Sequence, residues 1–338
     1  MNTTITADFA EMPFPKTLPE FQRMFGTEKQ CFAYLEKLRW PHGFVCDKCS
    51  AKGDAFRIAT RPEIFRCRKC RKDCSLTAGT VMHRTKQPLM MWFAAAYLVA
   101  SHTPGMSAVQ VQRQLGIGRY ETAFQMMHKL RAAMTRPDQD RIGGEFPVEI
   151  DETYVGGETR GEGAGVHHMA LVVGAVEVRP RKTEGGKRNI IAGRLRLRVV
   201  PDRKTKTLHS FVTESVQPHS QITTDGWGGY DGLSGLGYDH ESLTLGGDPA
   251  KAELALPMIH IVFANLKAWL QGTHHGAVSK DHLQAYLNEF TFRFNRRHTA
   301  QAAFRSLLGV GTRVTGPTYA GIYSGSYEHD DQGAKVTA

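Results

Sequence analysis

The chain has 338 residues, of which 41% are hydrophobic and 22% are charged. This composition is typical of a soluble globular protein, and the length suffices for two or three domains that each bury a core. The longest apolar run, residues 89–100, is too short to span a bilayer, and no apolar segment of the signal-peptide type follows Met1. We therefore expect a cytoplasmic protein without a membrane partner.

Basic charge is concentrated in the first part of the chain. Of the net charge of +10, residues 1–140 carry +9, with 21 Lys and Arg residues against 12 Asp and Glu residues. The rest of the chain is nearly balanced. A basic front and a neutral body favour binding of a polyanion such as DNA by the front part. A solvated basic surface without a partner gives the same charge pattern.

Helical periodicity is the main local signal at the start of the chain. Apolar residues recur at helical spacing between Leu18 and Leu38, with a predicted break at Gly26. The same spacing returns between Pro88 and Met134. The segment between these two helical stretches is rich in turn residues and holds most of the cysteines.

Two cysteine pairs with equal spacing predict a metal site. Cys46 and Cys49 form one C-x2-C pair, and Cys67 and Cys70 form the other after an interval of 17 residues. Four thiolates at this spacing surround one tetrahedral Zn²⁺ and leave no coordination position for a substrate, so the zinc is structural. All six cysteines lie in one short stretch, which suits metal binding in a reducing cytoplasm. Cys74 is close enough to compete as a ligand, although its spacing breaks the pattern.

Basic residues next to the cysteines and on a helical pair are candidates for contact with DNA. Residues 107–134 have the proportions of a helix-turn-helix, with a turn at Gly116–Gly118. In the second helix, polar side chains, His128 among them, are predicted to lie off the buried stripe and to reach base edges or phosphates. An ordinary helical hairpin has the same pattern. The candidate DNA-binding residues are Arg66, Arg68, Lys69, Arg71, Lys72, Arg119 and Lys129.

The second half of the chain changes to strand periodicity. We predict strands at residues 146–154, 168–178, 195–200 and 221–224, and helices at 205–215, 257–270 and 280–294. This order predicts an α/β fold, in which helices pack on a mixed sheet. The domain assignment is an N-terminal helical segment at 1–40, a zinc ribbon at 41–85, a helical DNA-binding segment at 86–140, a catalytic domain at 145–308 and a flexible tail at 309–338.

Two aspartates are candidates for catalytic metal ligands. Asp151 lies on the first predicted strand and shares a face with Glu149. A carboxylate on a face that helices cover is costly unless it is paired or bound to a metal. Asp225 follows the short strand and precedes a glycine-rich turn. Aspartates at the ends of neighbouring strands can hold two Mg²⁺ ions about 3.5–4 Å apart, although an aspartate before glycine is usually a turn former.

The helix from Pro257 supplies the third candidate. At about 100° per residue, one buried stripe is formed by Ile259, Val262, Phe263, Leu266 and Leu270. His260 and Lys267 lie on one flank of this stripe, and Asn265 lies on the other. If this flank lies next to the two aspartates, His260 is predicted to be a metal ligand and Lys267 a phosphate contact. Without the aspartates, a solvated polar flank explains the same pattern.

Together these residues resemble the transposases of the IS1595 insertion-sequence family, which have an ISXO2-like transposase domain. The resemblance covers nearly the whole chain, and its most specific pieces are Ile150-Asp-Glu-Thr-Tyr-Val-Gly-Gly157, Thr224-Asp-Gly-Trp227 and Gly272-Thr-His-His-Gly276. It implies a ribonuclease H-like domain of the DDE type and movement of DNA flanked by terminal inverted repeats. It also implies that Asp151 and Asp225 are the first two ligands of the catalytic metals.

The third catalytic position departs from the family pattern. Many members have Glu there, followed by Lys seven residues later, whereas this chain has His260 and Lys267. Asn is also associated with this position, but Asn265 lies on the opposite flank of the helix, so His260 is the candidate ligand. A neutral imidazole can bind a metal, and Mn²⁺ tolerates nitrogen better than Mg²⁺ does. The expected catalytic cofactor is therefore Mg²⁺ or Mn²⁺.

The sequence thus predicts a DNA transposase that binds terminal inverted repeats and catalyses metal-dependent strand cleavage and strand transfer. Asp151, Asp225 and His260 are expected to hold the metals, and Lys267 to hold a phosphate. We expect the protein to act at the nucleoid, as a homo-oligomer on DNA. Two alternatives stay open: a sequence-specific DNA-binding regulator with an inactive catalytic domain, and a structure-specific nuclease on the same fold.

Overall fold

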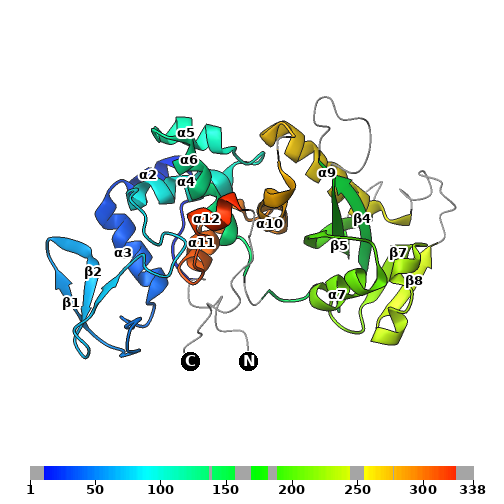
Figure 1. Cartoon of the computed structure of the whole chain (residues 1–338), viewed down its shortest axis with the longest axis horizontal. Coiled ribbons are helices and arrows are strands. Elements are labelled where there is room, and N and C mark those ends of the chain that lie inside the picture. Colours follow the sequence, from blue (N-terminus) through cyan, green and yellow to red (C-terminus); the bar gives the residue numbers. More distant parts are fainter. Residues whose placement is uncertain are drawn as a thin grey trace. The chain divides into compact units, whose positions relative to one another are not determined.

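The computed structural model describes residues 11–136, 139–156, 169–181, 189–243, 255–276 and 278–324. By its internal contacts the chain divides into two units (Figure 1). Unit 1 comprises the chain up to Asp138 and again from Arg296, and unit 2 comprises Gln139–Asn295. Each unit is described by itself. Among the described residues, no helix is both long and apolar enough to cross a membrane.

The first helices of unit 1 begin and end at residues that the sequence singles out. A capping box at Thr27 and Gln30 starts α3, directly after Gly26, where α2 ends. Gly116 adopts a φ of +63° and ends α5 in the left-handed region, which glycine enters without steric cost. The predicted breaks are therefore confirmed. The helices are α2 (Leu18–Phe25), α3 (Glu28–Arg39), α4 (Leu89–Ser101), α5 (Ala108–Leu115) and α6 (Tyr120–Ala132).

A small antiparallel sheet lies between α3 and α4 in the chain. Its strands, in spatial order, are β1 (Ala55–Ile58), β2 (Arg61–Cys67) and β3 (Asp73–Ser75). Trp40, Phe44 and Phe65 pack together beside it, with ring centroids 4.9 to 5.9 Å apart. So small a sheet buries little apolar surface, and a bound metal would therefore add to its stability.

The C-terminal helices complete the core of unit 1. Phe304 of α11 (Ala300–Gly311) lies 5.4 Å from Phe25 and 6.1 Å from Phe93, measured between ring centroids. The division between units therefore falls at residue 295, whereas we expected the catalytic domain to extend to residue 308. Part of the expected flexible tail is also structured, since α12 (Tyr319–Tyr323) follows and buries Ile322. The rest of the tail, residues 325–338, lies outside the described residues.

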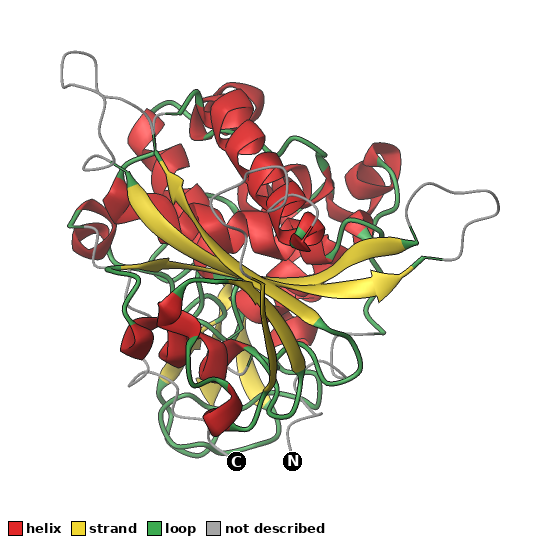
Figure 2. Ribbon diagram, turned by 90° about the vertical axis from the view of Figure 1, so that its right-hand side faces the viewer, coloured by secondary structure: helices red, strands yellow, loops and turns green. Residues whose placement is uncertain are grey.

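Unit 2 is built on a five-stranded mixed sheet with the order β6-β5-β4-β7-β8. The pairs β4–β5 and β5–β6 are antiparallel, whereas β4–β7 and β7–β8 are parallel. This is the ribonuclease H-like arrangement, as expected, and Figure 2 shows its twisted strands in yellow. The strands are β4 (Val148–Val155), β5 (Ala170–Pro180), β6 (Ile190–Val200), β7 (Gln221–Asp225) and β8 (Asp239–Leu243).

Helices cover both faces of this sheet. On one face, α9 (Pro257–His274) and α10 (Lys280–Asn295) form a core with alternate residues of β5 and β6. On the other, α7 (Thr205–Ser215) packs against Val148 and Ile150 of β4. Because side chains alternate along a strand, Glu149 and Asp151 of β4 face α9.

Candidate active site and zinc site

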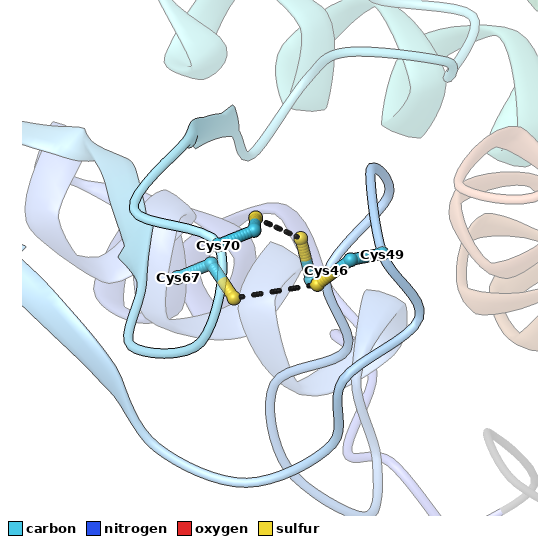
Figure 3. A group of neighbouring side chains, drawn as sticks. All are labelled: Cys46, Cys49, Cys67 and Cys70. Carbon is cyan, nitrogen blue, oxygen red and sulfur yellow. Dashed lines mark hydrogen bonds between the residues drawn. The ribbon is translucent and has the colours of Figure 1, made fainter.

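The four cysteines of the predicted metal site lie together in unit 1. Their sulfur atoms are all within 4.8 Å of one another, and Figure 3 shows that they come from two segments, one of which begins at the end of β2. Cys46 lies 3.7 Å from Cys70, and Cys49 lies 3.7 Å from Cys67, measured between Sγ atoms. Four sulfurs that bind one zinc at about 2.3 Å in a tetrahedron are about 3.8 Å apart. The arrangement of the four thiols is therefore close to that of a structural zinc site.

Local backbone geometry favours the thiolate at the first ligand. Burial opposes ionisation of Cys46, but the backbone N–H groups of Lys48 and Cys49 and neighbouring thiols outweigh it and lower the pKa of Cys46 to about 6. This is the result expected of a knuckle whose N–H groups point at a metal-bound sulfur.

A fifth cysteine lies beside this group. Cys74 Sγ is 3.7 Å from Cys46 Sγ and donates a hydrogen bond to Asp47 Oδ1 at 2.7 Å. Burial, together with the hydrogen bond to Asp47, keeps the pKa of Cys74 well above its ordinary value. Because Cys74 is hydrogen-bonded to Asp47 and lies outside the two C-x2-C pairs, we place it beside the four-sulfur set.

The basic residues around the second cysteine pair differ in what they contact. Arg66 forms an ion pair with Asp73 at 2.7 Å. Arg68 and Arg71 lie over the ring of Phe56, with guanidinium carbons 4.7 and 5.2 Å from its centroid. The ammonium groups of Lys69 and Lys72 belong to exposed side chains. Except for Arg66, this face presents cations that a phosphate backbone can reach.

On α6 the predicted polar flank is only partly exposed. Arg119, at the start of the helix, is exposed. Lys129 is half-buried and its Nζ donates to the carbonyl of His83 at 3.3 Å. His128 is fully buried, with its ring 4.2 Å from that of Phe124. The expectation that His128 lies off the buried stripe is therefore wrong, because the helices of unit 1 cover more than one side of α6.

In unit 2 the two aspartates are neighbours across a parallel strand pair. Ile150 of β4 pairs with Thr224 of β7, so the next residues, Asp151 and Asp225, lie side by side on the face that α9 covers. Adjacent strands are only about 4.8 Å apart. Asp225 is the last residue of β7, whereas Asp151 lies inside β4.

Glu149 fixes the helix that carries the third candidate. Its carboxylate Oε2 accepts the N–H groups of Met258 and Ile259, at 2.7 and 2.8 Å. These belong to the first turn of α9, where N–H groups have no partner within the helix. Glu149 is 6% exposed. Burial raises its pKa to about 7, although the two hydrogen bonds act in the opposite direction and lower it. The carboxylate that shares a face with Asp151 is therefore a cap for α9.

Close packing brings α9 onto the sheet beside Asp151. Gly174 of β5 pairs with Asp151, and a Cβ atom at this glycine would lie 2.9 Å from both Ile259 Cδ1 and Phe263 Cε1. A larger residue here would displace these packed side chains, so the glycine favours the close approach of the helix and the strand. The whole predicted stripe of α9 is buried, and it includes these two residues.

This packing turns His260 toward the carboxylates. His260 Nε2 lies 3.3 Å from Asp151 Oδ2, with side-chain exposures of 30% and 15%. Asn265 and Lys267 are both exposed. The structure therefore brings His260 to Asp151, and Asn265 stays at the surface.

Two family models match the chain, one in each unit. A family model for the ISXO2-like transposase domain matches residues 141–295, and one for the transposase zinc-ribbon domain matches residues 26–73. The chain belongs to the IS1595 transposase family. No curated protein and no solved structure matched it. The first match ends at residue 295, where unit 2 of the transposase also ends.

A network behind the carboxylates of the transposase was not predicted. Glu152 faces the α7 side, where it accepts hydrogen bonds from Arg203 Nε at 2.5 Å and Tyr230 Oη at 2.6 Å. Burial raises its pKa, and the charges of Asp151 and Asp225 add to this effect. Glu152 lies in a family motif, but its partners come from distant loops, so local pattern gives no signal for them.

The carboxylates of the transposase carry an excess of negative charge. Burial raises the pKa of Asp225, and the charge of Asp151 raises it further, against a hydrogen bond from the Trp227 N–H. Arg203 is engaged by Glu152. Two carboxylates and an imidazole suit Mg²⁺ or Mn²⁺, and a divalent cation would neutralise this charge.

The contact between Asp151 and His260 fits a shared divalent metal. Two ligands at a right angle on a metal at about 2.1 Å are about 3.0 Å apart, close to the 3.3 Å between Asp151 and His260. Among the described residues, the four thiols form a set within 4.8 Å, whereas Asp151, Asp225 and His260 do not. Binding of one metal by all three therefore requires a side-chain movement at Asp225 or His260.

Proposed function

We propose that this transposase binds the terminal inverted repeats of a DNA element and catalyses cleavage and transfer of DNA strands in unit 2. The observation that supports the proposal is the 3.3 Å contact of His260 Nε2 with Asp151 Oδ2, beside Asp225 of the neighbouring strand on a ribonuclease H-like sheet. Phosphoryl transfer requires charge neutralisation and alignment more than covalent chemistry. Two half-buried carboxylates and an imidazole supply ligands for that purpose.

In the proposed mechanism each residue has a separate task. Bound Mg²⁺ or Mn²⁺ ions would supply activation of water or a 3′-hydroxyl for in-line attack and stabilisation of the leaving oxygen. Asp151, Asp225 and His260 would hold the metal ions, and Glu149 positions His260 by capping α9. Lys267 is exposed on the same helix and is proposed to hold a flanking phosphate as a point charge.

Recognition of the DNA ends is assigned to unit 1. Residues 1–140 carry +9 of the net charge of +10, and the structure supports a role for Arg68, Lys69, Arg71, Lys72 and Arg119 because these side chains are exposed. Arg66 and Lys129 are weaker candidates, since an ion pair and a backbone carbonyl engage them. Joining two ends to one target requires at least two active sites, so we propose a homo-oligomer on DNA.

One experiment separates this function from its two alternatives. The full chain is incubated with Mg²⁺ or Mn²⁺ and labelled DNA that contains the flanks of its own gene, with unrelated target DNA present. A transposase cuts at the element end and joins the cut 3′ end to the target. A nuclease gives cleavage without joining, and a regulator binds the ends without cutting them. Either of these results contradicts the proposal.

A further inference from the structure

An exposed tryptophan lies directly beside the proposed active site. Trp227 is 43% exposed, whereas Trp40, Trp92 and Trp269 are at most 9% exposed. It follows Asp225 by two residues, and its backbone N–H donates to Asp225 Oδ1 at 3.1 Å. A large aromatic side chain left at the surface next to a functional site is often a contact for a ligand.

The indole ring is held in one orientation. Its Nε1–H donates to the carbonyl of Arg203 at 3.1 Å, and the guanidinium carbon of Arg203 lies 4.2 Å from the ring centroid. A Cβ atom at Gly229 would lie 2.6 Å from Trp227 Nε1, so the edge of the ring is packed against that backbone. Arg203 therefore covers one face of the indole ring, and the exposed surface of Trp227 includes the opposite face.

The guanidinium group of Arg203 is itself fixed and accessible. Arg203 Nε donates a hydrogen bond to Glu152 at 2.5 Å, and the side chain of Arg203 is 34% exposed. Arg203 also lines an open cavity of about 510 Å³, together with Tyr154 and Lys280. A rigid aromatic face beside a preorganised cation is the combination that binds unpaired nucleotides, by base stacking and by contact with the backbone.

We propose that Trp227 and Arg203 form a platform for one unpaired nucleotide next to the phosphate that is cut. The base stacks on the open face of the indole, and the guanidinium group contacts the adjoining phosphate. A nucleobase is the occupant because it is attached to the phosphodiester that the neighbouring carboxylates act on. The inference rests on the proposed strand cleavage, and it adds that the DNA is unpaired at this position.

Fluorescence tests the platform without requiring catalysis. The full-length Asp151→Asn variant is titrated with end-containing DNA, and tryptophan emission is recorded. Stacking should quench Trp227, while the three buried tryptophans give a constant background. An abasic site at the nucleotide flanking the cut should remove the quenching and leave binding intact, and Trp227→Phe should remove the signal. Equal quenching by normal and abasic DNA overturns the proposal.

Cleavage gives a second, independent test. Trp227→Leu should cut fully paired DNA on the order of 10-fold more slowly than Trp227→Phe, which keeps an aromatic face. A mismatch at the flanking position should restore much of the loss, because the base is then already unpaired. A purely structural tryptophan would show no such rescue. If the wild-type chain cuts the DNA and the Trp227→Leu and Trp227→Phe variants cut it at the same rate, the platform is wrong and the proposed function stands. If the wild-type chain does not cut the DNA, the proposed function is wrong, and the fluorescence titration alone tests the platform.

Discussion

Replacement of Glu149 tests how the helix that carries His260 is held. Glu149→Leu leaves the N–H groups of Met258 and Ile259, now bonded at 2.7 and 2.8 Å, without an acceptor in a buried place. Each such group costs about 1–3 kcal/mol. The buried carboxylate has a desolvation cost of its own, as its pKa of about 7 indicates. We therefore expect a loss near the lower end, about 2–3 kcal/mol of unfolding free energy in unit 2.

Glu149→Gln is the matched control. Its amide oxygen keeps an acceptor for both N–H groups and carries no charge, so we expect its stability to stay within about 1 kcal/mol of the wild-type value. Hydrogen exchange of the α9 amides, measured by mass spectrometry, reports the stability of this helix separately from that of unit 1. Exchange should accelerate in Glu149→Leu and stay close to wild type in Glu149→Gln.

The same pair of variants should differ in activity. If α9 loosens, His260 moves away from Asp151, so Glu149→Leu should lose metal-dependent cleavage while DNA binding is unchanged. Wild-type exchange and cleavage in Glu149→Leu would refute the capping role. Equal damage by the Gln and Leu variants would show that the negative charge matters, not the hydrogen-bond acceptor, and would also refute it.

Three further predictions concern zinc, pH and salt. Cys67→Ser should lower bound zinc from about one ion per chain, whereas Cys74→Ser should keep it; metal analysis that finds the reverse contradicts the ligand set. Burial alone would raise the pKa of Glu177, but hydrogen bonds from the backbone of Arg194 and from other groups outweigh it and lower this pKa. The ionised Glu177 carboxylate therefore stabilises the fold at any pH above the ordinary pKa of glutamate, and this stabilisation is lost as the pH falls through the lowered pKa. Glu177→Gln should cost about 2 kcal/mol in β5 and β6 at pH 7 and progressively less below pH about 4, by hydrogen exchange; a pH-independent difference would argue against this. Lys69→Glu in the full chain should weaken binding to DNA and flatten its dependence on salt, and unchanged binding isotherms would remove this surface from the DNA interface.

The fold of unit 2 could be predicted where apolar residues are periodic. The buried stripe of α9 and the apolar run of β5 identify themselves by sequence, and so does α7, whose bounds agree with the prediction. The edge strand β8 has mostly exposed side chains and no alternating pattern, so it was missed. The start of β6 was also missed, because residues 190–194 read as part of a basic turn.

Long-range packing accounts for most of what the sequence did not predict. Phe304 and Leu307 are spaced as in any amphipathic helix. The local sequence does not indicate that their helix packs in unit 1, although it follows unit 2 in the chain. In the site, alternation along β4 places Glu149 and Asp151 on one face. It does not reveal that Glu149 caps α9, or that Arg203 stacks on Trp227, because these contacts depend on how segments far apart in the chain meet.

The most direct test of the proposed active site is strand transfer by substituted full-length chains. The assay uses end-containing DNA, target DNA and Mn²⁺ or Mg²⁺, and DNA binding is measured in parallel. Asp151→Asn and His260→Ala should each abolish cleavage and joining and leave DNA binding intact, because both are proposed ligands of the catalytic metals and lie 3.3 Å apart. Asn265→Ala, which changes an exposed residue of the same helix, should act like the wild-type chain. Full activity of Asp151→Asn, or loss of activity in Asn265→Ala with His260→Ala unaffected, would contradict the account.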